Sequence, residues 1–219
     1  MRDNTILRRE AGWLGRAVFL LALSGCQALF TTSPVAFLQR DPADLPLEQR
    51  IEWARQALGS GDEEAMAKGY EAIYDDASGS SDGELTYLAA SLAMELSGAP
   101  QLAYEIIEGN ISYTDETDLQ AFLETVDGTY VVDAAGFFQA TLANDPALLS
   151  GSDYLLGAGC LLFQAGEENG GDLTALSAAQ VADAQAFVAA GLANLPAGDP
   201  ALTYLEDLQG FLSDPALFP

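Results

Sequence analysis

Residues 61–74 read GDEEAMAKGYEAIY, and this stretch carries both the start signal and the apolar spacing of one short helix. Asp62 suits a helix N-terminus, because its carboxylate accepts hydrogen bonds from N–H groups of the first turn. Met66, Tyr70 and Ile73 follow one another at intervals of four and three residues, so they share one face of a helix. The stretch therefore predicts a helix over residues 62–74 that packs through that face.

Similar patterns along the rest of the chain predict about nine helices, joined mostly by short connections. The predicted ranges are 47–58, 62–74, 85–96, 100–107, 117–126, 130–142, 152–163, 177–194 and 200–212. No convincing pair of strands occurs between them. The most economical packing of such a chain is an all-α fold of stacked antiparallel helical hairpins.

Some of the predicted boundaries rest on specific residues. Ser177 with Gln180 forms one of two capping boxes, and Ser152 is the predicted cap of the helix over 152–163. An acidic loop is predicted from residue 166 to residue 172. Residues 130–132 have strand propensity, but helical spacing of apolar residues continues beyond them, so we expect a helix there.

Three pairs of apolar or aromatic residues are each 34 positions apart: Trp53 and Tyr87, Tyr70 and Tyr104, Ile73 and Ile107. This is the period of the tetratricopeptide repeat, and residues 61–73 resemble the turn and second helix of such a repeat. The resemblance covers roughly residues 47–109 and has gaps, since Gly98 lies 37 positions after Gly61. It implies a degenerate helical repeat that presents a concave surface to peptides or proteins.

The stretch Leu23-Ser24-Gly25-Cys26 follows a short apolar run, residues 17–23, which is preceded by arginines. It resembles a bacterial lipobox, in which Cys26 becomes the first residue of the mature protein and carries fatty acyl chains such as palmitate. The apolar run is far shorter than the roughly 20 residues that cross a bilayer. The alternative is a plain cleaved signal peptide. Gln27, which is not an aspartate, implies by the same resemblance an outer-membrane lipoprotein that faces the periplasm.

These signals divide the chain into three parts. Residues 1–25 are the predicted lipoprotein signal peptide, residues 26–46 a lipid-anchored tether, and residues 47–219 the helical repeat-like domain. The remaining 194 residues form a chain long enough for one domain with a substantial core. Cys160 is the only other cysteine, and its apolar surroundings favour a buried structural residue.

The chain is strongly acidic. Beyond residue 25 there are four basic and 31 acidic residues, a formal charge of −27. This charge argues against binding to nucleic acid or to anionic lipid surfaces, because both require clusters of Lys and Arg. Salt screens the self-repulsion of such a chain, so we expect a halophilic source. The alternative is that the acidic residues attract cations or a basic partner.

The sequence does not contain the residues that several kinds of catalysis require. The chain has no histidine, which removes the usual general base and the usual zinc ligand. Two acidic loops, 75–82 and 167–172, do not fit an EF-hand. At the first, Ser81 and Tyr87 occupy the positions that need Gly and a bidentate Glu, and the second loop is shorter still. We therefore expect a protein without enzymatic activity, cofactor or metal.

The candidate ligand-binding residues are the aromatics of the repeat-like half, Trp53, Tyr70, Tyr74, Tyr87 and Tyr104, for which burial between helices is the alternative. The sequence predicts an envelope lipoprotein, attached to the membrane by lipid on Cys26, that binds an envelope protein as a scaffold or accessory subunit. The alternative is a small-ligand-binding lipoprotein, similar in kind to the helical-repeat component of some tripartite periplasmic transporters. An open groove favours the first function and a pocket lined by these aromatics the second.

Overall fold

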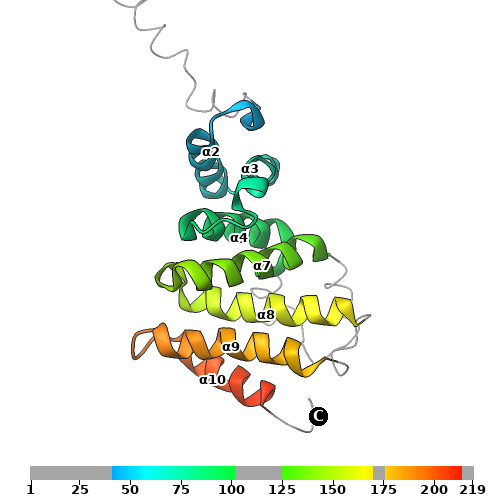
Figure 1. Ribbon diagram of the computed structural model, residues 1–219, viewed down its shortest axis with the longest axis vertical. Coiled ribbons are helices and arrows are strands. Elements are labelled where there is room, and N and C mark those ends of the chain that lie inside the picture. Colours follow the sequence, from blue (N-terminus) through cyan, green and yellow to red (C-terminus); the bar gives the residue numbers. More distant parts are fainter. Residues whose placement is uncertain (1–40, 102–124, 170–175, 214–219) are drawn as a thin grey trace, which may run out of the picture. The chain divides into compact units, whose positions relative to one another are not determined.

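The computed structural model describes residues 41–101, 125–169 and 176–213 (Figure 1). In these ranges it contains seven complete α-helices, two 3-10 turns and no strand, and residues 99–101 are also helical. The α-helices are α2 (Leu47–Ser60), α3 (Glu63–Ala77), α4 (Gly83–Ser97), α7 (Gly128–Asn144), α8 (Gly151–Glu168), α9 (Ala178–Asn194) and α10 (Ala201–Leu212). The predicted all-α fold of adjacent packed helices is confirmed.

Several predicted features lie on residues that the structure does not describe. The lipobox with Cys26, the signal peptide and most of the tether lie outside the described residues, as do Tyr104 and most of the helices predicted over 100–107 and 117–126. The chain divides into two compact units, 1–41 and 42–219, and only the second contains described helices. Among these helices, none is both long enough and apolar enough for a membrane span.

Local signals fix several helix ends as predicted. The Asp62 carboxylate accepts a hydrogen bond of 2.8 Å from the N–H of Ala65 at the start of α3. Ser177 and Gln180 form a complete capping box at the start of α9. Gly98 follows α4 with a φ of 74°, a left-handed conformation that glycine adopts without steric cost. Residues 130–132 are helical, within α7.

The start and end of α8 differ from the prediction. The N-cap is Ser150, and not Ser152, because Asp153 lies three residues after Ser150 and completes a capping box with it. The helix also continues to Glu168, through the start of the predicted acidic loop. Burial of Ala165 extends the apolar face, and the Asn169 side chain donates a 2.7 Å hydrogen bond to the Ala165 carbonyl. This bond satisfies a carbonyl that the helix end would otherwise leave free.

The seven described α-helices pack in chain order, each against the next, from α2 to α10 (Figure 1). The colour gradient of the figure shows that α8 and α9 run in opposite directions. Helix α4 is buried on most of its circumference and contacts α2, α3 and α7. A helix that is apolar nearly all round belongs in a core.

The folded unit begins slightly before the first long helix. The 3-10 turn η2 (Pro42–Asp44) contacts both α2 and α3, and Pro42 is buried. These residues belong to the stretch predicted as the tether, 26–46. The second 3-10 turn, η3 (Pro146–Leu148), connects α7 to α8.

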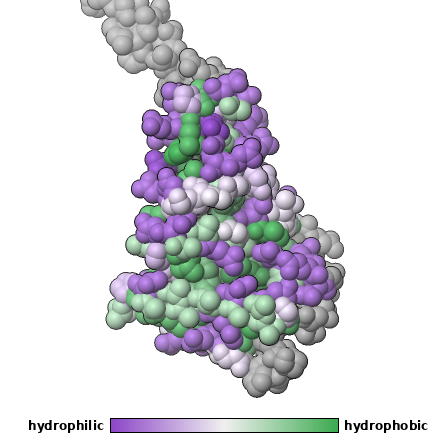
Figure 2. Space-filling view, in the orientation of Figure 1, coloured by the Kyte–Doolittle hydropathy of each residue, from purple (hydrophilic) through white to green (hydrophobic). Residues whose placement is uncertain are grey.

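Small residues let the C-terminal helices approach closely. Ala158 in α8 and Ala184 in α9 have no exposed surface. A Cβ atom built on Gly157 would lie 2.5 Å from the ring of Phe187, so α8 and α9 meet where only hydrogen fits. On the face shown in Figure 2, the many alanines of α9 form a pale green band, whereas hydrophilic residues gather over the α2–α3 end.

Candidate functional site

A pocket of about 410 Å³ that is open to solvent lies between α3 and the start of α7. Three tyrosines, four acidic residues and one threonine line it: Tyr70, Tyr74, Tyr130, Glu71, Asp75, Asp127, Asp133 and Thr129. Each helix contributes four of these residues or their caps. The pocket therefore combines aromatic rings with carboxylates.

Helical spacing explains why these residues meet. Residues 70, 71, 74 and 75 lie on one side of α3, because positions four apart are neighbours on a helix. Asp127 is the N-cap of α7 and accepts a 2.9 Å hydrogen bond from the N–H of Thr129. Both α3 and α7 pack against α4. The pocket thus lies between α3 and α7, two helices that pack against α4.

One hydrogen bond joins the two walls. The hydroxyl of Tyr70 in α3 donates to the carboxylate of Asp133 in α7 at 2.7 Å. The Tyr70 ring is only 5% exposed, so it forms the base of the pocket. This bond holds one pocket carboxylate at a fixed distance from the aromatic base.

The aromatic rings form a connected cluster around Tyr70. Its ring centroid lies 5.4 Å from those of Tyr74 and Tyr130, in edge-to-face geometry at 63° and 74°. Phe137 packs behind them, with its centroid 5.8 Å from that of Tyr74. Such contacts fix the ring orientations. Tyr74 nevertheless remains 37% exposed, so a ligand in the pocket has access to its ring.

The acidic residues of the pocket are not balanced by basic ones. None of the eight lining residues is basic. The basic residues of the described helices pair with other carboxylates: Arg50 with Asp76 at 2.8 Å, Arg55 with Glu84 at 2.8 Å, and Lys68 with Glu64 at 2.6 Å. Glu71 and Asp75 are exposed and make no ion pair or hydrogen bond within the described part of the chain. The pocket therefore has a local excess of negative charge.

The partly buried, acidic environment of the pocket raises the pKa values of two of its tyrosines. Burial raises the pKa of Tyr70 above its ordinary value, and the hydrogen bond and charge of Asp133 raise it further. Burial also raises the pKa of Tyr130, with contributions from the charges of Asp127 and Glu71. Both hydroxyls therefore stay protonated at neutral pH, and Tyr70 remains a hydrogen-bond donor.

A similar bond connects α4 to α8. The Tyr87 hydroxyl donates to the carboxylate of Asp153 at 3.2 Å, and burial together with the Asp153 charge raises the pKa of Tyr87. The unfolded chain ionises its tyrosines near pH 10, whereas folded Tyr70 and Tyr87 keep their protons to higher pH. Their stabilising contribution is thus complete below about pH 10 and is lost as pH rises through the folded pKa values.

We therefore expect the free energy of unfolding to fall steeply above about pH 10. The double variant Tyr70→Phe/Tyr87→Phe should show a shallower fall, because it retains the rings without the titrating hydroxyls. Urea unfolding followed by circular dichroism between pH 8 and pH 11.5 measures both slopes. Equal slopes would show that these two hydroxyls do not govern the alkaline transition.

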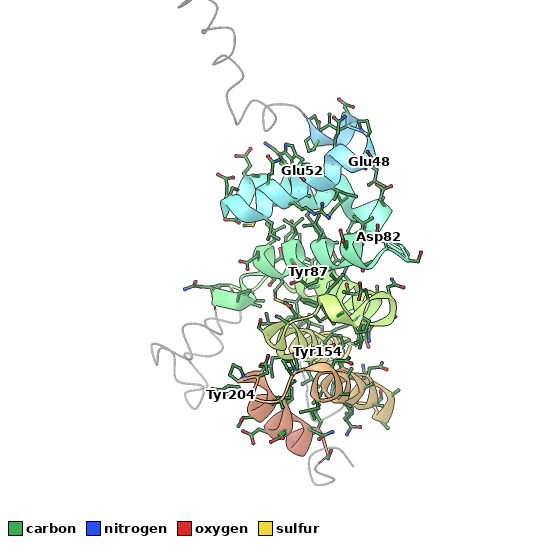
Figure 3. The ribbon with its side chains drawn as sticks, turned by 90° about the vertical axis from the view of Figure 1, so that its left-hand side faces the viewer. Glu48, Glu52, Asp82, Tyr87, Tyr154 and Tyr204 are labelled. Atoms are coloured by element: carbon green, nitrogen blue, oxygen red, sulfur yellow. The ribbon has the colours of Figure 1, made fainter. Side chains whose placement is uncertain are left out.

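The structure distributes the sequence-predicted aromatics over several places. Tyr70 and Tyr74 line the pocket. Trp53 is 2% exposed and packs against the backbone of α3 at Gly69. Tyr87, labelled in Figure 3, lies on α4, and its hydroxyl donates a hydrogen bond to Asp153 of α8. The pocket thus contains two of the five predicted residues.

Sequence reasoning missed the α7 half of the pocket, which comprises Asp127, Thr129, Tyr130 and Asp133. One signal was present: Tyr130 and Asp133 are three positions apart and share a helix face once α7 is accepted as a helix. Nothing in the sequence, however, indicated that this face lies opposite Tyr70, 63 positions from Asp133.

Other chemically notable groups have structural roles. A smaller pocket of about 110 Å³ between α7, α8 and α9 contains Gln180, which donates to Glu168 at 2.7 Å. Cys160 is buried, and burial raises the pKa of its thiol to about 12, so the reactive thiolate is disfavoured. In the described residues, no three acidic or cysteine side chains converge as metal ligands do.

We found no protein-family profile, curated protein or solved structure that matches the chain.

Proposed function

We propose that this protein is a lipid-anchored envelope protein that binds a protein partner through the helical surface around the α3–α7 pocket. The observation that carries the proposal is the combination, in one solvent-open pocket, of an exposed Tyr74 and acidic residues without basic neighbours. An open pocket admits a side chain that protrudes from a partner. Tyrosine is among the residues that contribute most to protein interfaces.

The residue inventory supports binding over catalysis. The chain has no histidine, and its second cysteine is buried with a raised pKa. The acidic residues of the pocket surround tyrosines whose hydroxyls stay protonated at neutral pH. Such groups serve as a recognition surface, which positions and desolvates a partner without transferring a proton to it.

One observation favours the alternative of a small-molecule ligand. The pocket volume of about 410 Å³ falls in the range of small-ligand sites, and two of the predicted aromatics line it. Against this, the pocket is open and strongly acidic, whereas small-ligand sites are mostly enclosed and apolar. The protein partner is therefore the leading proposal.

Zero-length carbodiimide cross-linking in intact cells, followed by mass spectrometry, tests the proposed function. The reagent joins carboxylates to amines, and this chain offers many carboxylates but a single lysine, Lys68. Links within the chain are therefore few, and most adducts report a neighbour.

The proposal predicts reproducible links from acidic residues of α3 and α7 to the lysines of one envelope protein. Links that involve only Lys68, or that spread evenly over many proteins, would contradict a specific protein partner. That result would favour the small-ligand function.

A further inference from the structure

We propose that the pocket between α3 and α7 binds an organic cation, a guanidinium or an alkylammonium group. The inference rests on the proposed function in that it takes the same pocket as the binding site, and it adds the chemistry of the group that enters. Neither a neutral nor an anionic group gains from the charges around the pocket.

The charge of the pocket is complementary to that of a cation. Glu71, Asp75, Asp127 and Asp133 surround the opening, and the basic residues of the described helices are paired elsewhere. A cation that enters is attracted by four formal negative charges. Burial raises the pKa of Tyr130, and the negative charges of Asp127 and Glu71 raise it further, which accords with the excess of carboxylates at the pocket.

Aromatic rings lie beside the carboxylates in the pocket. The face of a tyrosine ring carries negative electrostatic potential and attracts ammonium and guanidinium groups. Tyr74 and Tyr130 flank Tyr70 at equal centroid distances of 5.4 Å, and Tyr74 is partly exposed. A purely electrostatic site needs no such rings. Their position in the pocket favours a cation with an apolar or delocalised surface.

The arrangement of the carboxylates suits an organic cation better than a metal ion. They surround the pocket, and no three acidic side chains of the described helices converge on one point as the ligands of a metal ion do. Guanidinium is flat, with five donors, and its charge is distributed over the whole group. It accordingly matches spread carboxylates and stacks on a tyrosine ring at the same time.

Isothermal titration of the purified full-length protein, in a non-ionic detergent and about 0.1 M salt, tests the inference. The cationic probes are methylguanidinium and tetramethylammonium, and the neutral counterparts of similar shape are methylurea and tert-butanol. We expect each cation to bind at least about tenfold more tightly than its neutral counterpart, since every nearby carboxylate contributes about fivefold before salt screening. Equal binding of cation and counterpart would overturn the inference.

Two pairs of variants separate the pocket from the general acidity of the chain. Glu71→Gln/Asp75→Asn removes two pocket charges, and Glu206→Gln/Asp207→Asn removes two exposed charges from α10. We expect about tenfold weaker cation binding for the first variant and an unchanged affinity for the second. Tyr74→Leu should weaken binding about threefold, whereas Tyr204→Leu on α10 should not. Equal losses in the members of a pair would overturn the pocket as the site.

A further set of titrations, with peptides, identifies whether the cation comes from a protein or from a small molecule. A five-residue peptide with one central arginine is compared with methylguanidinium and with the same peptide carrying neutral citrulline. Tighter binding of the arginine peptide than of methylguanidinium indicates a protein source, and equal binding indicates a small molecule. Cation binding by the purified protein without a cross-linked partner in cells would refute the proposed function alone. A cross-linked partner without cation preference would refute this inference alone.

Discussion

Replacement of Cys26 with alanine is expected to lower the membrane-bound fraction of the protein by more than about tenfold, because it removes the proposed attachment site of all the acyl chains. The reason is that each buried acyl methylene contributes about 0.8 kcal/mol to attachment. Without Cys26, no residue of the predicted lipobox can carry the chains. Fractionation of carbonate-washed membranes, followed by immunoblotting, measures the change.

Cys160→Ala is the matched control, because it removes the only other cysteine and leaves the proposed lipid attachment site intact. Cys160 is 4% exposed within α8, so its loss should leave the membrane-bound fraction unchanged. If the Cys26→Ala variant stays with the washed membranes, the lipid anchor is wrong. A wild-type protein found only in the soluble fraction would contradict it equally.

Gly157→Ala is expected to destabilise the domain by about 1–3 kcal/mol, because overpacking of a tight interface forces side chains or backbone to move. Its new methyl group would lie 2.5 Å and 2.6 Å from two atoms of the Phe187 ring and 3.4 Å from Phe138. Phe187 and Phe138 are each 1% exposed, so neither ring has free space to enter. Urea unfolding followed by circular dichroism gives the free-energy difference.

Gly159→Ala, two positions along the same helix, supplies the control. No atom lies within 4 Å of a Cβ built there, and the position is exposed. Alanine favours helix over glycine by up to about 1 kcal/mol, so this variant should be as stable as the wild type or more stable. Equal stability of the two variants would mean that α8 and α9 do not pack as closely as described.

Local signals made much of the fold predictable. Asp62, Gly98 and the pair Ser177–Gln180 act within three residues of a helix end, so the sequence alone reveals them. The error at Ser152 was also local, since Ser150 and Asp153 satisfy the same capping rule. The end of α8 was missed because burial, as at Ala165, decides how far this helix continues. Burial depends on neighbours that are distant in sequence.

The candidate site was only half predictable for the same reason. Tyr70 and Tyr74 stand out because they are aromatic and one helical turn apart. Tyr130 and Asp133 join them only through the packing of α3 and α7 against α4. The acidic residues gave no signal of their own, since a chain with 33 Asp and Glu residues has carboxylates near every surface.

Charge acts at two levels in this protein. The overall excess of acid keeps the surface strongly negative, and the few basic residues of the described helices form ion pairs within or between helices. Arg50 also donates a 2.6 Å hydrogen bond to the Ala72 carbonyl, so it connects α2 to α3 in addition to pairing with Asp76. The basic residues of the described helices therefore pair with carboxylates that do not line the pocket.

Site-specific photo-cross-linking in cells tests most directly whether a partner binds at the α3–α7 pocket. A photoreactive phenylalanine analogue replaces either Tyr74, at the pocket, or Tyr204, which is 64% exposed on α10 near the other end of the helical stack from Glu48 and Glu52 (Figure 3). We expect one discrete adduct with an envelope protein from position 74 and none from position 204. Adducts of equal yield from both positions, or from position 204 alone, would contradict binding at the pocket.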